Sequence, residues 1–161
     1  MDVCEGCGLD RDAITADEVI PRVRAGLSGV LGALAPGSPD LARRPAPGVW
    51  SVLEYSAHIR DVLLNQREGI IVALGEDEPV KQRMYREQRV DLGMYALETA
   101  AEISKSIEVA GRLFTNTFAV LSPEHLARTA VYAGQPRTLR WVGTQAVHEV
   151  EHHLADVRAQ L

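Results

Sequence analysis

The strongest constraint on the fold is a run of apolar residues at helical spacing between Tyr95 and Leu121. These residues recur at steps of three and four, at Ala100, Ile103, Ile107, Ala110, Phe114, Phe118 and Leu121. Such steps place side chains on one face of an α-helix. The pattern therefore predicts a long amphipathic helix that buries this face against other helices.

Three further helices are predicted from their end signals. Thr15 and Ser51 are each followed three residues later by glutamate, a capping box that satisfies the free amides of a first helical turn. These boxes predict helices over residues 15–34 and 51–74. Thr138 leads into a last helix that runs to Leu161.

The connections between these helices are long. Residues 35–50 contain four prolines, which oppose helix formation. Residues 75–94 are rich in charge and predict a solvated loop, with room for a short helix, and residues 129–138 predict a short extended or hairpin segment. We therefore expect an all-α, four-helix bundle over residues 15–161, preceded by a tail of residues 1–14.

The charge pattern excludes some partners. The net charge is −5 and the 17 basic residues are spread through the chain, which argues against nucleic acid as a partner. No apolar run approaches the ~20 residues that span a bilayer, and the polar N-terminus is no signal peptide. We expect a cytoplasmic protein that acts on a small molecule, without a membrane partner.

The last predicted helix carries a histidine pair. His148 and His152 are one turn apart and lie on the same face, whereas His153 is turned by about 100° and is the poorer candidate ligand. Such a pair alone is more often structural than a metal site. His58, in the second predicted helix, is the candidate third ligand, and we expect His125 to be solvated.

The pair shares an apolar stripe with Trp141, Ala155 and Ala159, which permits a homodimer. Glu149 and Glu151 flank the pair and could orient the ligands or act as bases, but their spacing predicts that both lie on solvated seams.

The residues Trp50-Ser51-Val52-Leu53-Glu54 before His58, and His148-x-x-x-His152 before His153-Leu154-Ala155-Asp156-Val157, resemble the DinB-like superfamily. This superfamily includes mycothiol-dependent maleylpyruvate isomerases and thiol S-transferases. The resemblance covers residues 15–161. It implies a four-helix bundle with a long crossover, in which His58, His148 and His152 bind one divalent metal ion.

Three imidazoles suit zinc, with nickel or iron as alternatives, and leave coordination positions open for water or substrate. The resemblance favours a transferase that activates a low-molecular-weight thiol of the mycothiol or bacillithiol type. The alternatives are a metal-dependent hydrolase and a non-catalytic protein that binds a metal or ligand. Arg83, Arg86 and Arg89 are expected in a solvated loop, and would bind a substrate carboxylate only if that loop folded over the site.

Cys4 and Cys7 form Cys-Glu-Gly-Cys-Gly, half of a zinc-site pattern. A labile disulfide, a zinc site completed by histidine or a second subunit, and two unpaired thiols on a mobile terminus are all compatible with it. We favour the unpaired thiols and expect both cysteines to be dispensable for the bundle and for the histidine-bound ion.

Overall fold

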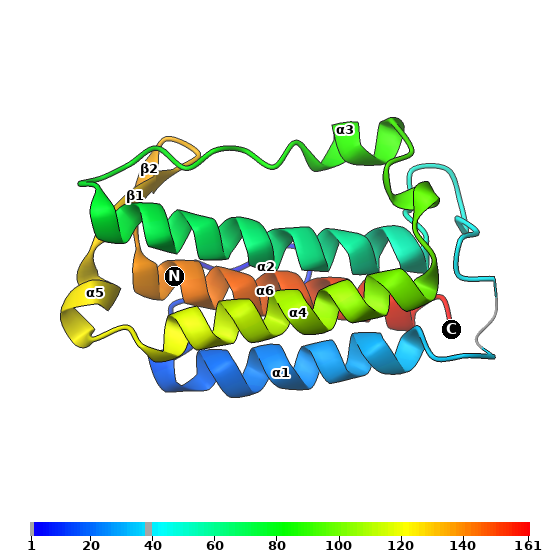
Figure 1. The fold of residues 1–161 in the computed structure, drawn as a ribbon, viewed down its shortest axis with the longest axis horizontal. Helices are drawn as coiled ribbons and strands as arrows, with labels where there is room; N and C mark the ends of the chain where they lie inside the picture. The colour runs from blue at the N-terminus through cyan, green and yellow to red at the C-terminus, as the bar shows by residue number, and fades with distance from the viewer. Residues whose placement is uncertain (1, 38–39) are drawn as a thin grey trace.

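The computed structural model describes residues 2–37 and 40–161. Four long helices form a bundle (Figure 1), namely α1 (Ala16–Ala33), α2 (Val52–Gly75), α4 (Ala100–Ala119) and α6 (Leu139–Arg158). The connections hold α3 (Arg86–Asp91), a 3-10 helix η1 (Tyr95–Leu97), α5 (Pro123–Ala127) and the antiparallel hairpin of β1 (Thr129–Tyr132) and β2 (Gln135–Thr138). The four-helix bundle and the hairpin are confirmed. Ser38 and Pro39, within the predicted proline-rich connector, lie outside the described residues.

The order of the helices explains the long connections. Around the bundle α1 packs on α6, α6 on α2, α2 on α4, and α4 on α1. Figure 1 shows that α2 and α4 run in the same direction, so residues 76–99 must travel back along the whole bundle between them. This segment is the predicted long crossover.

The apolar stripe of α4 faces the core as predicted. Ile103, Ile107 and Phe114 have no exposed surface, and Phe118 is 4% exposed. The helix begins at Ala100 rather than near Tyr95 because Thr99 caps it. The Glu102 carboxylate accepts a hydrogen bond from the Thr99 amide at 2.8 Å. This contact is part of a capping box that the prediction overlooked.

The crossover is fixed to the bundle at a buried carboxylate on α2. Asp61 accepts hydrogen bonds from Arg89 of α3 at 2.5 Å and from the Tyr95 hydroxyl of η1 at 2.9 Å. Its side chain is 8% exposed. Most of residues 75–94 are exposed and α3 is the short helix allowed for in the predicted loop, but Arg89 and the adjacent Tyr95 anchor this segment to the buried carboxylate.

The N-terminal residues pack along α6 instead of forming a mobile tail. Val3 and Asp10 form an antiparallel bridge, and Trp141 Nε1 donates a hydrogen bond to Asp2 Oδ2 at 2.5 Å. This segment covers part of the apolar stripe that carries His148 and His152, while Ala155 and Ala159 stay exposed. The homodimer stays a prediction.

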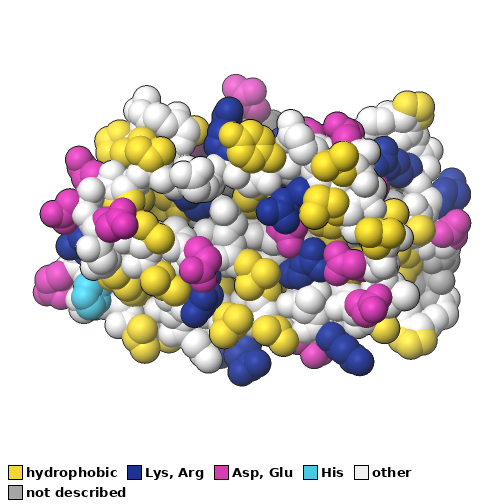
Figure 2. Space-filling model, turned by 45° about the horizontal axis from the view of Figure 1, so that its top comes forward, with side chains coloured by type: hydrophobic (Ala, Val, Ile, Leu, Met, Phe, Trp, Pro, Cys, Tyr) yellow, Lys and Arg dark blue, Asp and Glu magenta, His cyan; other side chains and the backbone are white. Residues whose placement is uncertain are grey.

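The surface is mixed in character. On the face in Figure 2 apolar, basic and acidic side chains are interspersed. Within the described part of the chain, no helix is both long enough and apolar enough to cross a membrane.

Candidate functional site

The three histidines predicted to share one ion are divided between two clusters. His58 of α2 lies with Glu149 and His153, whereas His148 and His152 lie with Cys4 and Cys7. A third possible group, His152, His153 and Asp156, shares one residue with each of these clusters. In each cluster one potential ligand atom per residue lies within 4.8 Å of the others. The single site formed by His58, His148 and His152 stays a prediction, but the structure does not bring those three residues together as one group.

The first cluster centres on one carboxylate oxygen. Glu149 Oε2 lies 3.4 Å from His58 Nε2 and 3.4 Å from His153 Nε2. Ligand atoms bound at 2.0–2.1 Å at a tetrahedral angle are separated by about 3.3–3.4 Å. The spacing therefore fits a divalent ion held by two imidazoles and one carboxylate, a ligand set that leaves coordination positions open.

Neighbouring residues orient these three side chains. His153 Nδ1 lies 2.8 Å from Asp156 Oδ2, which leaves Nε2 turned toward Glu149. The other Glu149 oxygen accepts a hydrogen bond from Gln145 Nε2 at 2.5 Å, and Gln145 in turn accepts one from Arg11. Carboxylate and amide partners of this kind fix the ring and carboxylate orientation of metal ligands.

Aromatic rings enclose the histidines. Trp50 packs edge-on against His58 at 5.3 Å between ring centroids, and Tyr55 stacks on His153 at the same distance. Trp50 and Tyr55 are only partly buried. Trp50 directly precedes α2 and Tyr55 lies near its start, and the Ser51 cap between them fixes the direction of the helix.

The protonation states suit metal binding. Burial raises the pKa of Glu149, but the neighbouring His148, His153 and His58 side chains lower it by more, so the net pKa lies below the usual glutamate value. Burial lowers the pKa of His58. An ionised carboxylate and a neutral imidazole are the forms that bind a metal.

One prediction about α6 is wrong, because Glu149 does not lie on a solvated seam and its side chain is only 14% exposed. His153, taken as the poorer candidate ligand, is 8% exposed and faces His58, so it is a candidate as well. The sequence did carry a signal, since Glu149 and His153 have the same four-residue spacing as His148 and His152. Glu151 fits the earlier prediction better, because it is one-third exposed and pairs with Arg22 at 2.7 Å.

The second cluster has a different character. Cys4 Sγ lies 3.9 Å from His152 Nδ1. The Cys7 amide, the His148 side chain and the Gly6 amide lower the pKa of Cys4 to about 6, so its thiolate is readily formed.

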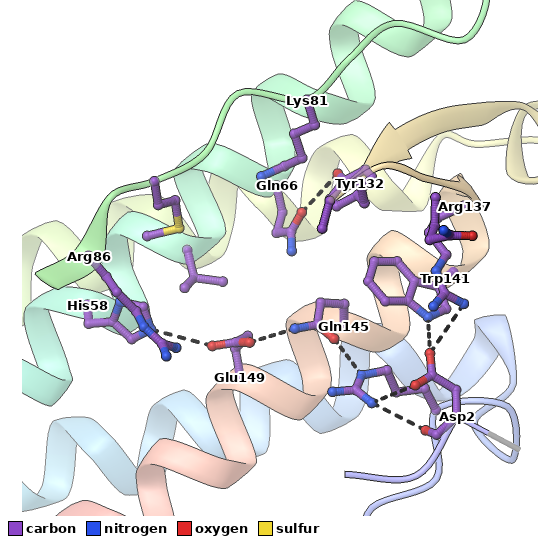
Figure 3. A pocket seen from close by; sticks show the side chains of 15 residues that line it. Asp2, His58, Gln66, Lys81, Arg86, Tyr132, Arg137, Trp141, Gln145 and Glu149 are labelled. Atoms are coloured by element: carbon purple, nitrogen blue, oxygen red, sulfur yellow. Dashed lines mark hydrogen bonds and ion pairs between the residues drawn. The ribbon is translucent and has the colours of Figure 1, made fainter.

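A cleft of about 440 Å³ opens beside the first cluster (Figure 3). His58 and Glu149 lie at one end, and α2, the crossover, the hairpin, α6 and the N-terminal segment all contribute to the wall. The cleft is lined by four cationic side chains, Arg11, Lys81, Arg86 and Arg137, and by two acidic ones, Asp2 and Glu149.

Of the loop arginines considered from the sequence, only Arg86 lines this cleft. Arg89 instead binds Asp61. Lys81 was not anticipated, because nothing near it in the sequence marks it. Burial lowers the pKa of Lys81 to about 8, and its Nζ lies 5.0 Å from the centre of the Tyr132 ring.

Comparison with known proteins identifies the family. The DinB superfamily model matches residues 21–157. The chain belongs to the DinB superfamily. No curated protein matches the sequence significantly.

Two solved structures share the fold of this DinB protein. One is YfiT from Bacillus subtilis, described as a probable metal-dependent hydrolase with an unusual four-helix bundle topology. It superposes with a TM-score of 0.82 and 16% sequence identity, and the match covers 94% of this chain and 90% of YfiT. The other is a mycothiol-dependent maleylpyruvate isomerase, at a TM-score of 0.74 and 14% identity. That match covers 92% of this chain but only 63% of the isomerase. At these identities the likeness establishes the fold alone.

Proposed function

We propose that this DinB protein is a metal-dependent transferase that activates a low-molecular-weight thiol, of the mycothiol or bacillithiol type, for attack on an anionic electrophile. The observation that carries the proposal is the cluster of His58, Glu149 and His153 beside a cleft with cationic walls. A cleft of about 440 Å³ falls within the usual size range of small-molecule sites.

In this proposal His58, Glu149 and His153 hold the ion, with zinc as the first choice. A bound divalent ion would supply a Lewis acid that lowers the pKa of a thiol and so favours the nucleophilic thiolate. Asp156 and Gln145 keep His153 and Glu149 in position for this task.

The remaining wall of the cleft selects the second substrate. Arg86 and Arg137 come from opposite sides, the crossover and the hairpin, and Lys81 comes from the crossover. Guanidinium groups bind carboxylates with two parallel hydrogen bonds. The electrophile is therefore proposed to carry a carboxylate or a similar anionic group.

A metal-dependent hydrolase is the second candidate. The match to YfiT, which covers most of both chains, favours it. An open site of two imidazoles and one carboxylate serves equally well to activate water. The two candidates differ in whether turnover requires a thiol.

The test is to incubate the zinc-loaded protein with an electrophile that carries a carboxylate, such as 4-chloro-3,5-dinitrobenzoate, and, in turn, mycothiol, bacillithiol and glutathione. We expect conjugation that requires the ion and one of the thiols and that is lost in His58→Ala and Glu149→Gln. Glu151→Gln, on the same helix but outside the cluster, serves as the control and should retain activity.

Two results would contradict the transferase. If no thiol is conjugated but a nitrophenyl ester is hydrolysed in a manner that depends on His58, the hydrolase is correct. If neither reaction occurs while the ion still binds, the protein is a non-catalytic metal-binding protein.

A further inference from the structure

The second cluster brings the two ends of the chain together. Cys4 and Cys7 come from the N-terminal segment, and His148 and His152 come from α6. One potential ligand atom from each residue lies within 4.8 Å of the others, and Cys4 Sγ is 3.9 Å from His152 Nδ1. Two sulfur and two nitrogen atoms around one zinc ion are separated by about 3.3–3.8 Å. The four side chains are thus near the spacing of a tetrahedral site.

The backbone around the cysteines forms a tight turn that aims both of them at α6. The Cys4 amide donates to the Leu9 carbonyl at 2.9 Å, and the Gly8 amide donates to the Cys4 carbonyl at 2.8 Å. Gly8 has a φ of +73°, a conformation that favours glycine. A Cβ at Gly6 would lie 3.1 Å from the His152 ring, so glycine allows the turn to approach the histidine closely.

His148 supplies an independent sign of a ligand. Its side chain is more than nine-tenths buried, and neither ring nitrogen has a hydrogen-bond partner among the described residues. The nearest carboxylate oxygen, Glu149 Oε1, is 3.6 Å from Nδ1, beyond hydrogen-bonding distance. Buried imidazole nitrogens without partners are costly, and a metal ion would satisfy one of them.

The donor set indicates which ion binds. A Cys-x-x-Cys pair with a His-x-x-x-His pair provides two thiolates and two imidazoles, which is a ligand set and spacing of structural zinc sites. Soft thiolate ligands favour zinc over magnesium or calcium. Four protein ligands complete a tetrahedron and leave no position for substrate, so this site would be structural.

We infer that Cys4, Cys7, His148 and His152 bind a zinc ion that fastens the N-terminal segment to α6, separate from the ion proposed at His58, Glu149 and His153. This choice replaces the expectation that the cysteines are dispensable. It is independent of the proposed function, because the two sites share no ligand.

The site would also shape the cleft. Asp2 and Arg11, which flank the cysteine turn, line the cleft, and Arg11 binds the Gln145 side chain that holds Glu149. Fastening the turn to α6 therefore fixes these two cleft residues. Loss of the zinc should loosen one wall of the cleft without removing any ligand of the other ion.

The test uses the full chain without an affinity tag, since a histidine tag binds metal. Cys4 and Cys7 are the only cysteines, so a chromogenic disulfide reagent that reacts with thiols reports on this site alone. In zinc-loaded protein we expect both thiols to react slowly, and to react at once after a strong chelator removes the zinc. The cobalt-substituted protein should show thiolate-to-cobalt charge-transfer absorption.

Variants separate the two sites. Cys4→Ser/Cys7→Ser should lose one equivalent of zinc and the charge-transfer absorption, whereas His58→Ala should keep the absorption and the slow thiol reaction. Rapid thiol reaction in zinc-loaded protein, absence of the charge-transfer absorption, or a Cys4–Cys7 disulfide in protein purified with zinc and without oxidant would each overturn the inference. These readouts on the unaltered chain remain decisive even if the double variant does not fold.

Discussion

His153 Nε2 and Glu149 Oε2 lie 3.4 Å apart, one turn from each other on α6. The neighbouring pair, His148 and His152, has the same four-residue spacing along the helix, and its ring centroids lie 5.2 Å apart. The two pairs are interleaved along the helix but face different elements. One faces α2 and the other faces the N-terminal segment.

This division predicts which substitutions remove which ion. His153→Ala should abolish the ion beside the cleft because it removes one of three ligands, while His148→Ala should remove the ion held by the cysteines. Elemental analysis of the purified variants, combined with the thiol reaction, measures both ions separately. If His153→Ala keeps full metal content while His148→Ala and His152→Ala lose an ion whether or not the cysteines are present, the three-histidine site predicted from the sequence is correct.

Asp156 is expected to act on the ion beside the cleft through His153, whose Nδ1 lies 2.8 Å from its carboxylate. Removing a partner of this kind costs about 10–100-fold in metal affinity. We therefore expect Asp156→Ala to weaken zinc binding at the cleft by that factor without eliminating it, as measured by competition with a fluorescent chelator. Glu151→Ala, a similarly exposed carboxylate on the same helix, is the control. Equal affinities in the two variants would show that Asp156 has no positioning role.

Alanine substitutions at two helical glycines should change the stability of the bundle in opposite directions. A Cβ at Gly143 of α6 would lie 2.3 Å from the Phe118 ring, whereas a Cβ at Gly32 of α1 meets nothing within 4 Å. Gly143→Ala should therefore destabilise the protein by about 1–3 kcal/mol through overpacking. Gly32→Ala should stabilise it by up to about 1 kcal/mol, because alanine has the higher helix propensity. Urea denaturation measures both, and a neutral Gly143→Ala would mean that Phe118 moves aside without cost.

The sequence predicted the helices because their signals are local. Capping residues such as Thr15 and Ser51 and the apolar spacing of α4 act within a few turns of chain, and the structure follows them. Even the error at the start of α4 came from overlooking a local signal at Thr99.

The grouping of the site residues was not predictable in the same way. The spacing in HEVEHH allows either His148 with His152 or Glu149 with His153, and a rotation of α6 of about 100° exchanges the pair that faces α2. That rotation is set by packing between distant segments, and so is the return of Cys4 to a position beside His152, 148 positions away.

Lys81 should titrate near neutrality. Burial lowers its pKa to about 8, so the ammonium should lose its proton as the pH rises through this value, well below the range of a solvated lysine. Because a charged Lys81 favours anions in the cleft, affinity for an anionic substrate should fall as the pH rises through this pKa. In Lys81→Met this affinity should depend less on pH.

The direct measurement is the rate of amine labelling of Lys81 at a series of pH values, followed by peptide mass spectrometry. Lys105, the only other lysine and an exposed one, reports how the reagent itself responds to pH. We expect Lys81 labelling to reach half its maximum near pH 8, and a midpoint above pH 10 would show that the cleft does not perturb this side chain.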